Sequence, residues 1–176
     1  MGSGTSFFGV GGRGRRVGYV VDKSGSMGVE DRMLLAKAEI IRSIGELPDY
    51  ASVCVVLFDE SFTTFDKEGG FVKCRDEQVS NMKSWIRSIL QGGGTDPVPA
   101  FEFLLSRRER PDMVFFMSDG EIPPDAADEI LRLNRRGPNT VIHCLAFGRD
   151  AGLAPLRRIA SETGGTFSVV GQGMTP

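Results

Sequence analysis

The stretch Val17–Met27 reads VGYVVDKSGSM and joins a continuous apolar run to a polar loop. An apolar run without alternation is typical of a strand that is buried on both faces, as in a parallel sheet. The loop places Asp22, Ser24 and Ser26 at every second position, so their oxygens can converge on one point. The stretch therefore predicts a buried parallel strand, over Val17–Val21, that ends in an oxygen-rich loop.

The rest of the chain alternates between strand-like and helix-like segments. Further apolar runs, which predict strands, are Ser52–Phe58, Met113–Met117, Thr140–Phe147 and Thr166–Val170. The segments with helical periodicity are Asp31–Leu47, Arg75–Leu90, Pro97–Arg107, Asp125–Arg135 and Gly152–Glu162. In the first of these helices, three- and four-residue steps predict an apolar face made of Met33, Leu34, Ala38, Ile41 and Ile44.

One segment breaks this alternation. No helix separates Ser61–Lys73 from the strand before it, so we expect it to turn back as an antiparallel edge strand. The order of segments predicts an α/β fold: a doubly wound, Rossmann-like, mostly parallel six-stranded sheet with one antiparallel edge strand and helices on both faces. In such sheets, ligands bind outside the carboxyl ends of the strands, where the strand order reverses. We expect the first and fourth strands to flank that point.

Composition sets the broad class. The chain has 176 residues with a formal net charge of -2, and 40% of its residues are hydrophobic and 25% charged. This is typical of one globular domain, which we place at residues 16–176, after a flexible lead-in or vector-derived segment over residues 1–15. The charge leaves no basic excess for nucleic acid. No apolar run approaches the roughly 18 residues of a membrane span, so we expect no direct membrane insertion.

The cysteines and the histidine argue against thiolate or imidazole chemistry. Cys54, Cys74 and Cys144 are odd in number and lack C-x-x-C spacing, so they predict neither a disulfide framework nor a zinc site. His143 lies inside an apolar run and is expected to be a core or sheet-face residue.

Two other loops carry small polar residues. One is Gly92–Asp96, in which glycines permit unusual backbone angles and Thr95 offers a hydroxyl. The other is Met117–Glu121, which puts Asp119 directly after a buried strand. Together with the first loop they supply two carboxylates and three hydroxyls, a hard oxygen donor set that suits Mg²⁺ or Mn²⁺.

These residues resemble the metal-ion-dependent adhesion site (MIDAS) of von Willebrand factor A, or integrin I-like, domains. The motif of that family is D-x-S-x-S, then a Thr on a later loop, then an Asp after a further strand. The matching positions are Asp22, Ser24, Ser26, Thr95 and Asp119. The resemblance implies that the two serines ligate the ion directly. It implies that the other three residues bind it directly or through water.

The resemblance also implies a function. A site rich in neutral hydroxyls leaves the ion positively charged, with an exchangeable position that a Glu or Asp of a partner protein fills. We therefore expect a metal-binding, magnesium- or manganese-dependent protein-binding module, monomeric and without catalytic activity. We expect it to be a soluble domain cut from a larger bacterial protein, with its compartment left open.

Several alternatives remain open. The domain could be an adaptor or subunit that works with an ATPase or chelatase, as some members of the family do. A Mg²⁺-dependent phosphatase-like enzyme could use Asp22 as nucleophile, although Ser24 stands where such enzymes place a second carboxylate. Residues Met1–Ser6 formally match an N-myristoylation signal, although a vector-derived origin explains them as well.

Two residues beside the motif also have two interpretations each. Lys23 either points to solvent, which we expect, or aids an acidic partner. Asp96 is expected to cap the helix that Pro97 opens, and the alternative is a supporting role at the metal.

Overall fold

The computed structural model describes residues 4–7, 10–66, 68, 70–120, 122–147 and 152–170, with side chains from Gly14 onward. Among these residues, no helix combines the length and the apolar character that crossing a bilayer requires. Residues 1–3, on which the myristoylation signal depends, lie outside the described part.

The main sheet is mixed, mostly parallel and seven-stranded, with the order β5-β4-β3-β7-β8-β9 and β6 also paired to β4. The parallel strands are β3 (Arg16–Asp22), β4 (Ser52–Phe58), β7 (Met113–Ser118), β8 (Val141–Phe147) and β9 (Phe167–Val170). Each matches a predicted strand to within one residue at either end. As predicted, β3 and β7 are the neighbours at which the strand order reverses.

The antiparallel edge differs from the prediction in one respect. Instead of one strand, the segment after β4 forms two short strands, β5 (Phe62–Thr64) and β6 (Val72–Lys73). Both pair with β4: β5 runs along its carboxyl-terminal half, where Phe62 faces Phe58, and β6 along its amino-terminal half, where Val72 faces Val53. The sheet has seven strands rather than six for this reason.

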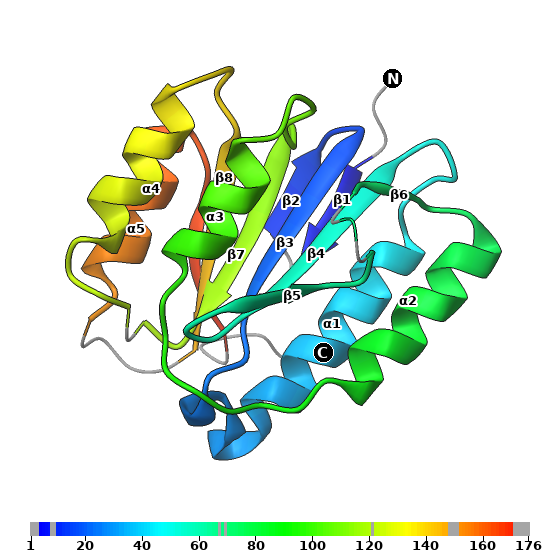
Figure 1. Ribbon diagram of the computed structural model, residues 1–176, viewed down its shortest axis with the longest axis horizontal. Coiled ribbons are helices and arrows are strands. Elements are labelled where there is room, and N and C mark those ends of the chain that lie inside the picture. Colours follow the sequence, from blue (N-terminus) through cyan, green and yellow to red (C-terminus); the bar gives the residue numbers. More distant parts are fainter. Residues whose placement is uncertain are drawn as a thin grey trace.

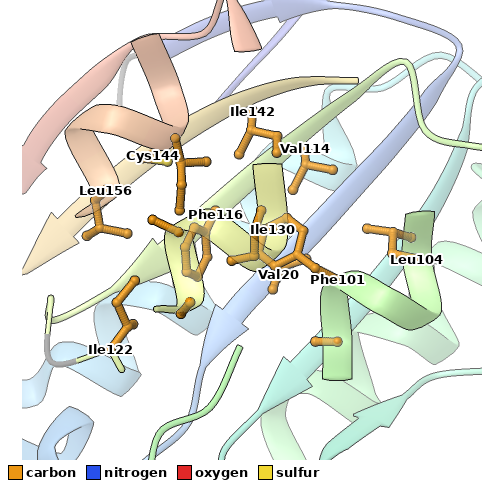
Figure 2. Close-up of a cluster of buried hydrophobic side chains, with 14 of the residues drawn as sticks. Val20, Phe101, Leu104, Val114, Phe116, Ile122, Ile130, Ile142, Cys144 and Leu156 are labelled. Carbon is orange, nitrogen blue, oxygen red and sulfur yellow. The ribbon is translucent and has the colours of Figure 1, made fainter. Parts of the chain in front are cut away.

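Helices cover both faces of the sheet (Figure 1). On one face lie α1 (Arg32–Gly45) and α2 (Asp76–Ser88), and on the other α3 (Val98–Leu105), α4 (Ala126–Arg135) and α5 (Ala154–Thr163). Successive side chains of a strand point to opposite faces. Thus Tyr19 and Val21 join the core beneath α1, whereas Val20 joins the core beneath α3. Figure 2 shows this second core, in which Phe101 and Phe116 meet edge to face at 5.0 Å.

The apolar face predicted for α1 is correct at Met33 and Ile44 and wrong at Leu34 and Ala38. The buried positions are Met33, Ala36, Ile40, Ser43 and Ile44. Leu34 is exposed, Ala38 is exposed and Ile41 is only partly buried against the core. The helix starts after a segment of 3₁₀ helix, and its buried residues join the core that the sheet and α2 also line. Both sets satisfy helical spacing, so spacing alone did not distinguish them.

Residues that precede β3 form a hairpin, which the sequence did not predict. β1 (Gly4–Phe7) pairs antiparallel with β2 (Val10–Arg13), and β1 contacts α1. The glycine-rich composition of β2, expected to be a lead-in, carries no strand signal.

The cysteines and the histidine lie where they were expected. Cys54, Cys74 and Cys144 are free and buried, and two strands separate Cys54 from Cys144. Burial raises the pKa of the Cys54 thiol to about 12, so it is inert as a nucleophile. His143 is 7% exposed and stacks on Phe115 at 5.4 Å.

Candidate metal centre

Three connections gather at the carboxyl ends of β3 and β7, at the lower end of the sheet in Figure 1. They are the loop after β3, which continues into the 3₁₀ segment η1 (Gly25–Asp31), the connection between α2 and α3, and the loop after β7. The five residues predicted as ligands are distributed over these three connections.

Asp22 is the last residue of β3 and is fully buried. Its Oδ1 accepts a hydrogen bond from the backbone N–H of Ser24 at 2.8 Å, and its Oδ2 accepts one from the Ser118 hydroxyl at 2.8 Å. Burial is the main cause that raises the pKa of Asp22, and the nearby Asp119 carboxylate raises it further. The two hydrogen-bond donors oppose this rise. The carboxylate is thus held in one orientation in a place that disfavours its negative charge.

Ser24 and Ser26 follow on the same loop, and their hydroxyls form a hydrogen bond in which the two oxygens lie 3.1 Å apart. Ser24 is buried, and Ser26, within η1, is partly exposed. Two adjacent ligands of an octahedral Mg²⁺ ion, each about 2.1 Å from the metal, are separated by roughly 3.0 Å. The serine pair therefore has the spacing of two neighbouring ligands.

The loop that carries Thr95 is hydrogen-bonded to the loop that carries the serines. Gly92 N–H donates to the Lys23 carbonyl at 2.8 Å, and Gly25 N–H donates to the Gly93 carbonyl at 3.2 Å. Gly93 has φ +83, and a Cβ there would lie 3.1 Å from the Asp59 side chain, so glycine is required. Thr95, half-buried, is thereby brought to the same end of the sheet.

Asp96 ties the same loop to its neighbours. Its backbone N–H donates to the Asp59 carbonyl at 2.7 Å, and its Oδ1 accepts from the N–H of Val98, the first residue of α3, at 3.0 Å. The predicted capping role is therefore confirmed.

Asp119 directly follows β7 and is 7% exposed. Val21 of β3 pairs with Met117 of β7, so Asp22 and Asp119 lie at the ends of neighbouring strands, and the Asp119 carboxylate adds to the rise in the pKa of Asp22. Ser118, the last residue of β7, connects the two positions, because its hydroxyl donates to Asp22 and accepts from the Gly120 N–H at 3.2 Å. Arg32, the first residue of α1, places Nη1 3.7 Å from Asp119 Oδ2.

The expectation that Lys23 points to solvent is wrong. Its ammonium forms an ion pair with Asp59, and the two side chains are only 15% and 14% exposed. Asp59 also receives hydrogen bonds from the backbone N–H and the hydroxyl of Ser61. Burial alone would raise the pKa of Asp59, but these donors together with Lys23 lower it.

Three residues at this end of the sheet were missed by reasoning from the sequence: Ser118, Arg32 and Asp59. Ser118 could have been predicted as a site residue. It precedes Asp119 at the end of β7, and β7 is the parallel neighbour of β3, whose last residue is Asp22. Arg32 and Asp59 carry no local signal, since their partners lie 87 and 36 residues away.

The donor set decides which ions the site could hold. In the part of the chain that the structure describes, no three His, Cys, Asp or Glu side chains cluster as a metal-binding group. A metal here would depend on serine and threonine hydroxyls beside two carboxylates. Such all-oxygen sets suit hard cations that keep several waters, of which Mg²⁺ is typical.

Comparison with known proteins identifies the family of the fold. The von Willebrand factor type A domain family matches residues 15–169. No curated protein matches the chain in sequence.

Solved structures show the same fold at low identity. A von Willebrand factor type A protein from Catenulispora acidiphila is 20% identical, with a TM-score of 0.78 over 92% of this chain and 40% of its own. The proximal thread matrix protein 1 of the mussel byssus, with a zinc-occupied MIDAS motif, is 19% identical, with a TM-score of 0.67 over 88% of this chain and 41% of its own. The SpRpn10 VWA domain is 13% identical, with a TM-score of 0.64 over 89% and 87%. This chain therefore spans less than half the length of the first two proteins.

Proposed function

Because the chain belongs to the von Willebrand factor type A domain family, we propose that it is a divalent-metal-dependent protein-binding module with a MIDAS at the carboxyl end of its sheet. The proposed metal ligands, direct or through water, are Asp22, Ser24, Ser26, Thr95 and Asp119. Mg²⁺ or Mn²⁺ is the proposed ion, and the MIDAS of the mussel protein is described as zinc-occupied, so Zn²⁺ belongs in the test.

The observation that carries the proposal is the pair of hydroxyls 3.1 Å apart, on a loop that the Asp22 carboxylate holds in place. The two hydroxyls form a hydrogen bond with each other, and the same spacing would let both oxygens ligate one ion. Asp22 adds a buried carboxylate with a raised pKa, which a cation would stabilise in its charged form.

The ligand chemistry explains why a partner would bind through a carboxylate. Two carboxylates carry just enough negative charge to neutralise a divalent ion. They neutralise less of the ion's charge when they bind it through water than when they bind it directly. Mg²⁺ retains waters, so an incoming Glu or Asp replaces a water and needs no new cage. The chain would bind, orient and present the ion, and the partner would complete its coordination.

Exposed apolar side chains beside the site fit a protein partner. Val29, in η1, is 51% exposed, Leu34, in the first turn of α1, is 66% exposed, and Leu90 is 80% exposed. Leu90 is brought near α1 because Lys37 donates hydrogen bonds to the carbonyls of Arg87, in the last turn of α2, and of Ile89. Exposed apolar groups on η1, on α1 and after α2 would give a partner apolar area to bury around its carboxylate.

We propose that the domain is not an enzyme. Both oxygens of Asp22 accept hydrogen bonds within the fold and the residue is fully buried, which makes it a poor nucleophile for a phosphatase-like reaction. The adaptor alternative keeps the same site and differs only in partner, an ATPase or chelatase rather than an adhesion target. We further propose that the domain is monomeric and belongs to a larger bacterial protein.

The metal half of the proposal is tested by melting the protein in EDTA and in saturating Mg²⁺, Mn²⁺ or Zn²⁺. An ion that binds only the folded state at ten to a hundred times its Kd stabilises it by about 1.4–2.7 kcal/mol. For a domain of this size that raises Tm by roughly 3–10 °C. Asp119→Ala should abolish the increment, whereas Asp128→Ala, an exposed aspartate on α4, should retain it. A wild-type protein, folded and metal-free, whose Tm does not change with any of these ions contradicts the proposal.

The partner half is tested with a peptide array in which a central Glu or Asp is flanked by apolar or by polar residues. Binding should require the divalent ion, be lost when the central residue is Gln or Asn, and be stronger for apolar flanks. Binding of equal strength in EDTA would contradict the proposed role of the metal.

A further inference from the structure

We infer that Arg32 is an internal counter-cation of the candidate metal centre, which pairs with Asp119 in the metal-free protein and weakens the binding of the divalent ion. The inference rests on the proposed function, because it concerns the same site. It adds a residue, outside the proposed ligand set, that sets how tightly the ion is held.

The contact between the two residues is the first observation. Arg32 Nη1 lies 3.7 Å from Asp119 Oδ2, and the side chains of Arg32 and Asp119 are 18% and 2% exposed. The other guanidinium nitrogen, Nη2, lies 3.7 Å from Glu30 Oε2, on a side chain that is 80% exposed. Water screens the outer pair, whereas the inner pair is shielded from water and interacts more strongly. The guanidinium is therefore held mainly by the carboxylate that belongs to the candidate site.

The backbone before Arg32 is the second observation. Glu30 has φ 53 and ψ 35, and Asp31 has φ 56 and ψ 21, so two consecutive residues with side chains adopt the left-handed conformation. This conformation is disfavoured for such residues and persists where the surrounding structure imposes it. These two residues end η1, which also carries Ser26, and directly precede Arg32, so one strained segment links a proposed ligand to the counter-cation.

Electrostatics then predicts opposite effects in the two states. Without a metal, Asp22 and Asp119 repel each other, and the guanidinium offsets part of that repulsion. A divalent ion beside Asp119 takes over this role and repels the guanidinium, which has to move away or remain at a cost. Removing the arginine should therefore weaken the metal-free fold and strengthen metal binding. A residue that only anchored the start of α1 would destabilise both states alike and leave the metal affinity unchanged.

The test compares Arg32→Gln and Arg32→Met with Arg32→Lys and with Arg158→Gln as a matched control. Arg158 is an arginine of α5 that pairs with Asp128 and Glu162, away from the site. Titration calorimetry with Mg²⁺ and with Mn²⁺ should give a Kd about three- to tenfold lower for the Gln and Met variants. The Lys variant, which keeps the charge, and the control should stay within about twofold of the wild type. In EDTA, the Gln and Met variants should melt below the wild type, with a larger Tm increment on adding metal.

The outcomes separate the inference from the function beneath it. If the wild type binds no divalent ion, the proposed function fails. If the wild type binds the ion and the Gln and Met variants bind it equally or more weakly, the inference is overturned while the function stands. Variants that fold only when Mg²⁺ is added support the inference, because the ion then replaces the guanidinium. Variants that stay unfolded even in saturating Mg²⁺ overturn it.

Discussion

Replacing Ser118 with alanine tests how the buried Asp22 carboxylate is kept in the fold. Ser118 is fully buried, and its hydroxyl both donates to Asp22 Oδ2 at 2.8 Å and accepts from the Gly120 N–H at 3.2 Å. Alanine fills nearly the same space, so the substitution removes two hydrogen bonds and creates almost no cavity. The effect on stability should therefore report on the polar contacts.

The magnitude follows from the charges involved. A hydrogen bond to a charged group contributes about 1.5–3 kcal/mol, and the Gly120 N–H loses an acceptor in a buried position as well. We expect Ser118→Ala to lower the free energy of unfolding by about 2–4 kcal/mol in EDTA at pH 7. At 2–4 °C for each kcal/mol, Tm should fall by about 4–16 °C. The loss should shrink at acidic pH, because a protonated Asp22 needs the donor less.

Urea denaturation in EDTA, followed by fluorescence or circular dichroism, measures the loss. Ser84→Ala is the matched control, since the Ser84 hydroxyl donates to the Ser80 carbonyl on the exposed surface of α2 and should contribute about 0.5 kcal/mol or less. A double-mutant cycle with Asp22→Asn should show a coupling of about 0.5–3 kcal/mol. A loss no larger than that of the control, or no coupling, would refute the view that Ser118 stabilises the Asp22 charge.

Three further predictions concern other parts of the fold. Burial lowers the pKa of His143 from its ordinary 6.5, so on acidification the unfolded chain takes up the proton first. In EDTA, Tm should therefore decline as pH falls below about 6.5, and His143→Asn should lack that part of the decline; an identical pH profile would contradict this reasoning. Lys23→Met should lower the free energy of unfolding by about 1–2 kcal/mol, because it leaves the largely buried Asp59 without its cation. Urea denaturation measures this loss, and an unchanged free energy of unfolding would mean that the ion pair contributes nothing to stability. A Cβ at Gly165 would lie 1.9 Å from the Ile142 carbonyl oxygen, so Gly165→Ala should lower the free energy of unfolding by at least about 1–3 kcal/mol. Gly92 has open space around it, so Gly92→Ala should be close to neutral in the same melting assay.

The elements of the parallel sheet could be predicted because burial on both faces leaves a direct trace in the sequence. Ser52–Phe58 is an unbroken apolar run, and β4 occupies the same residues. The proposed ligands could also be located, because each directly follows such a run or lies in a glycine-rich loop. The regular alternation of strand and helix then places their loops at one end of the sheet.

What could not be predicted depends on partners distant in sequence. The buried stripe of α1 includes Ala36 and excludes Leu34, a choice made by packing and not by spacing. Lys23 is drawn from solvent by Asp59, a residue on another connection. The left-handed pair before Arg32 has no signature in residue type, because neither Glu30 nor Asp31 is glycine.

The division of the antiparallel edge into β5 and β6 also bears on how the protein resists aggregation. β4 is an uncharged, fully buried strand rich in β-branched residues, a composition that forms intermolecular β-structure readily when its hydrogen-bonding edge is open. β5 covers one half of that edge and β6 the other, although they are only three and two residues long. Local unfolding or proteolytic cutting of the connection between them would expose the edge of β4 to another molecule. β5 and β6 thus protect the edge of β4 from pairing with a strand of another molecule.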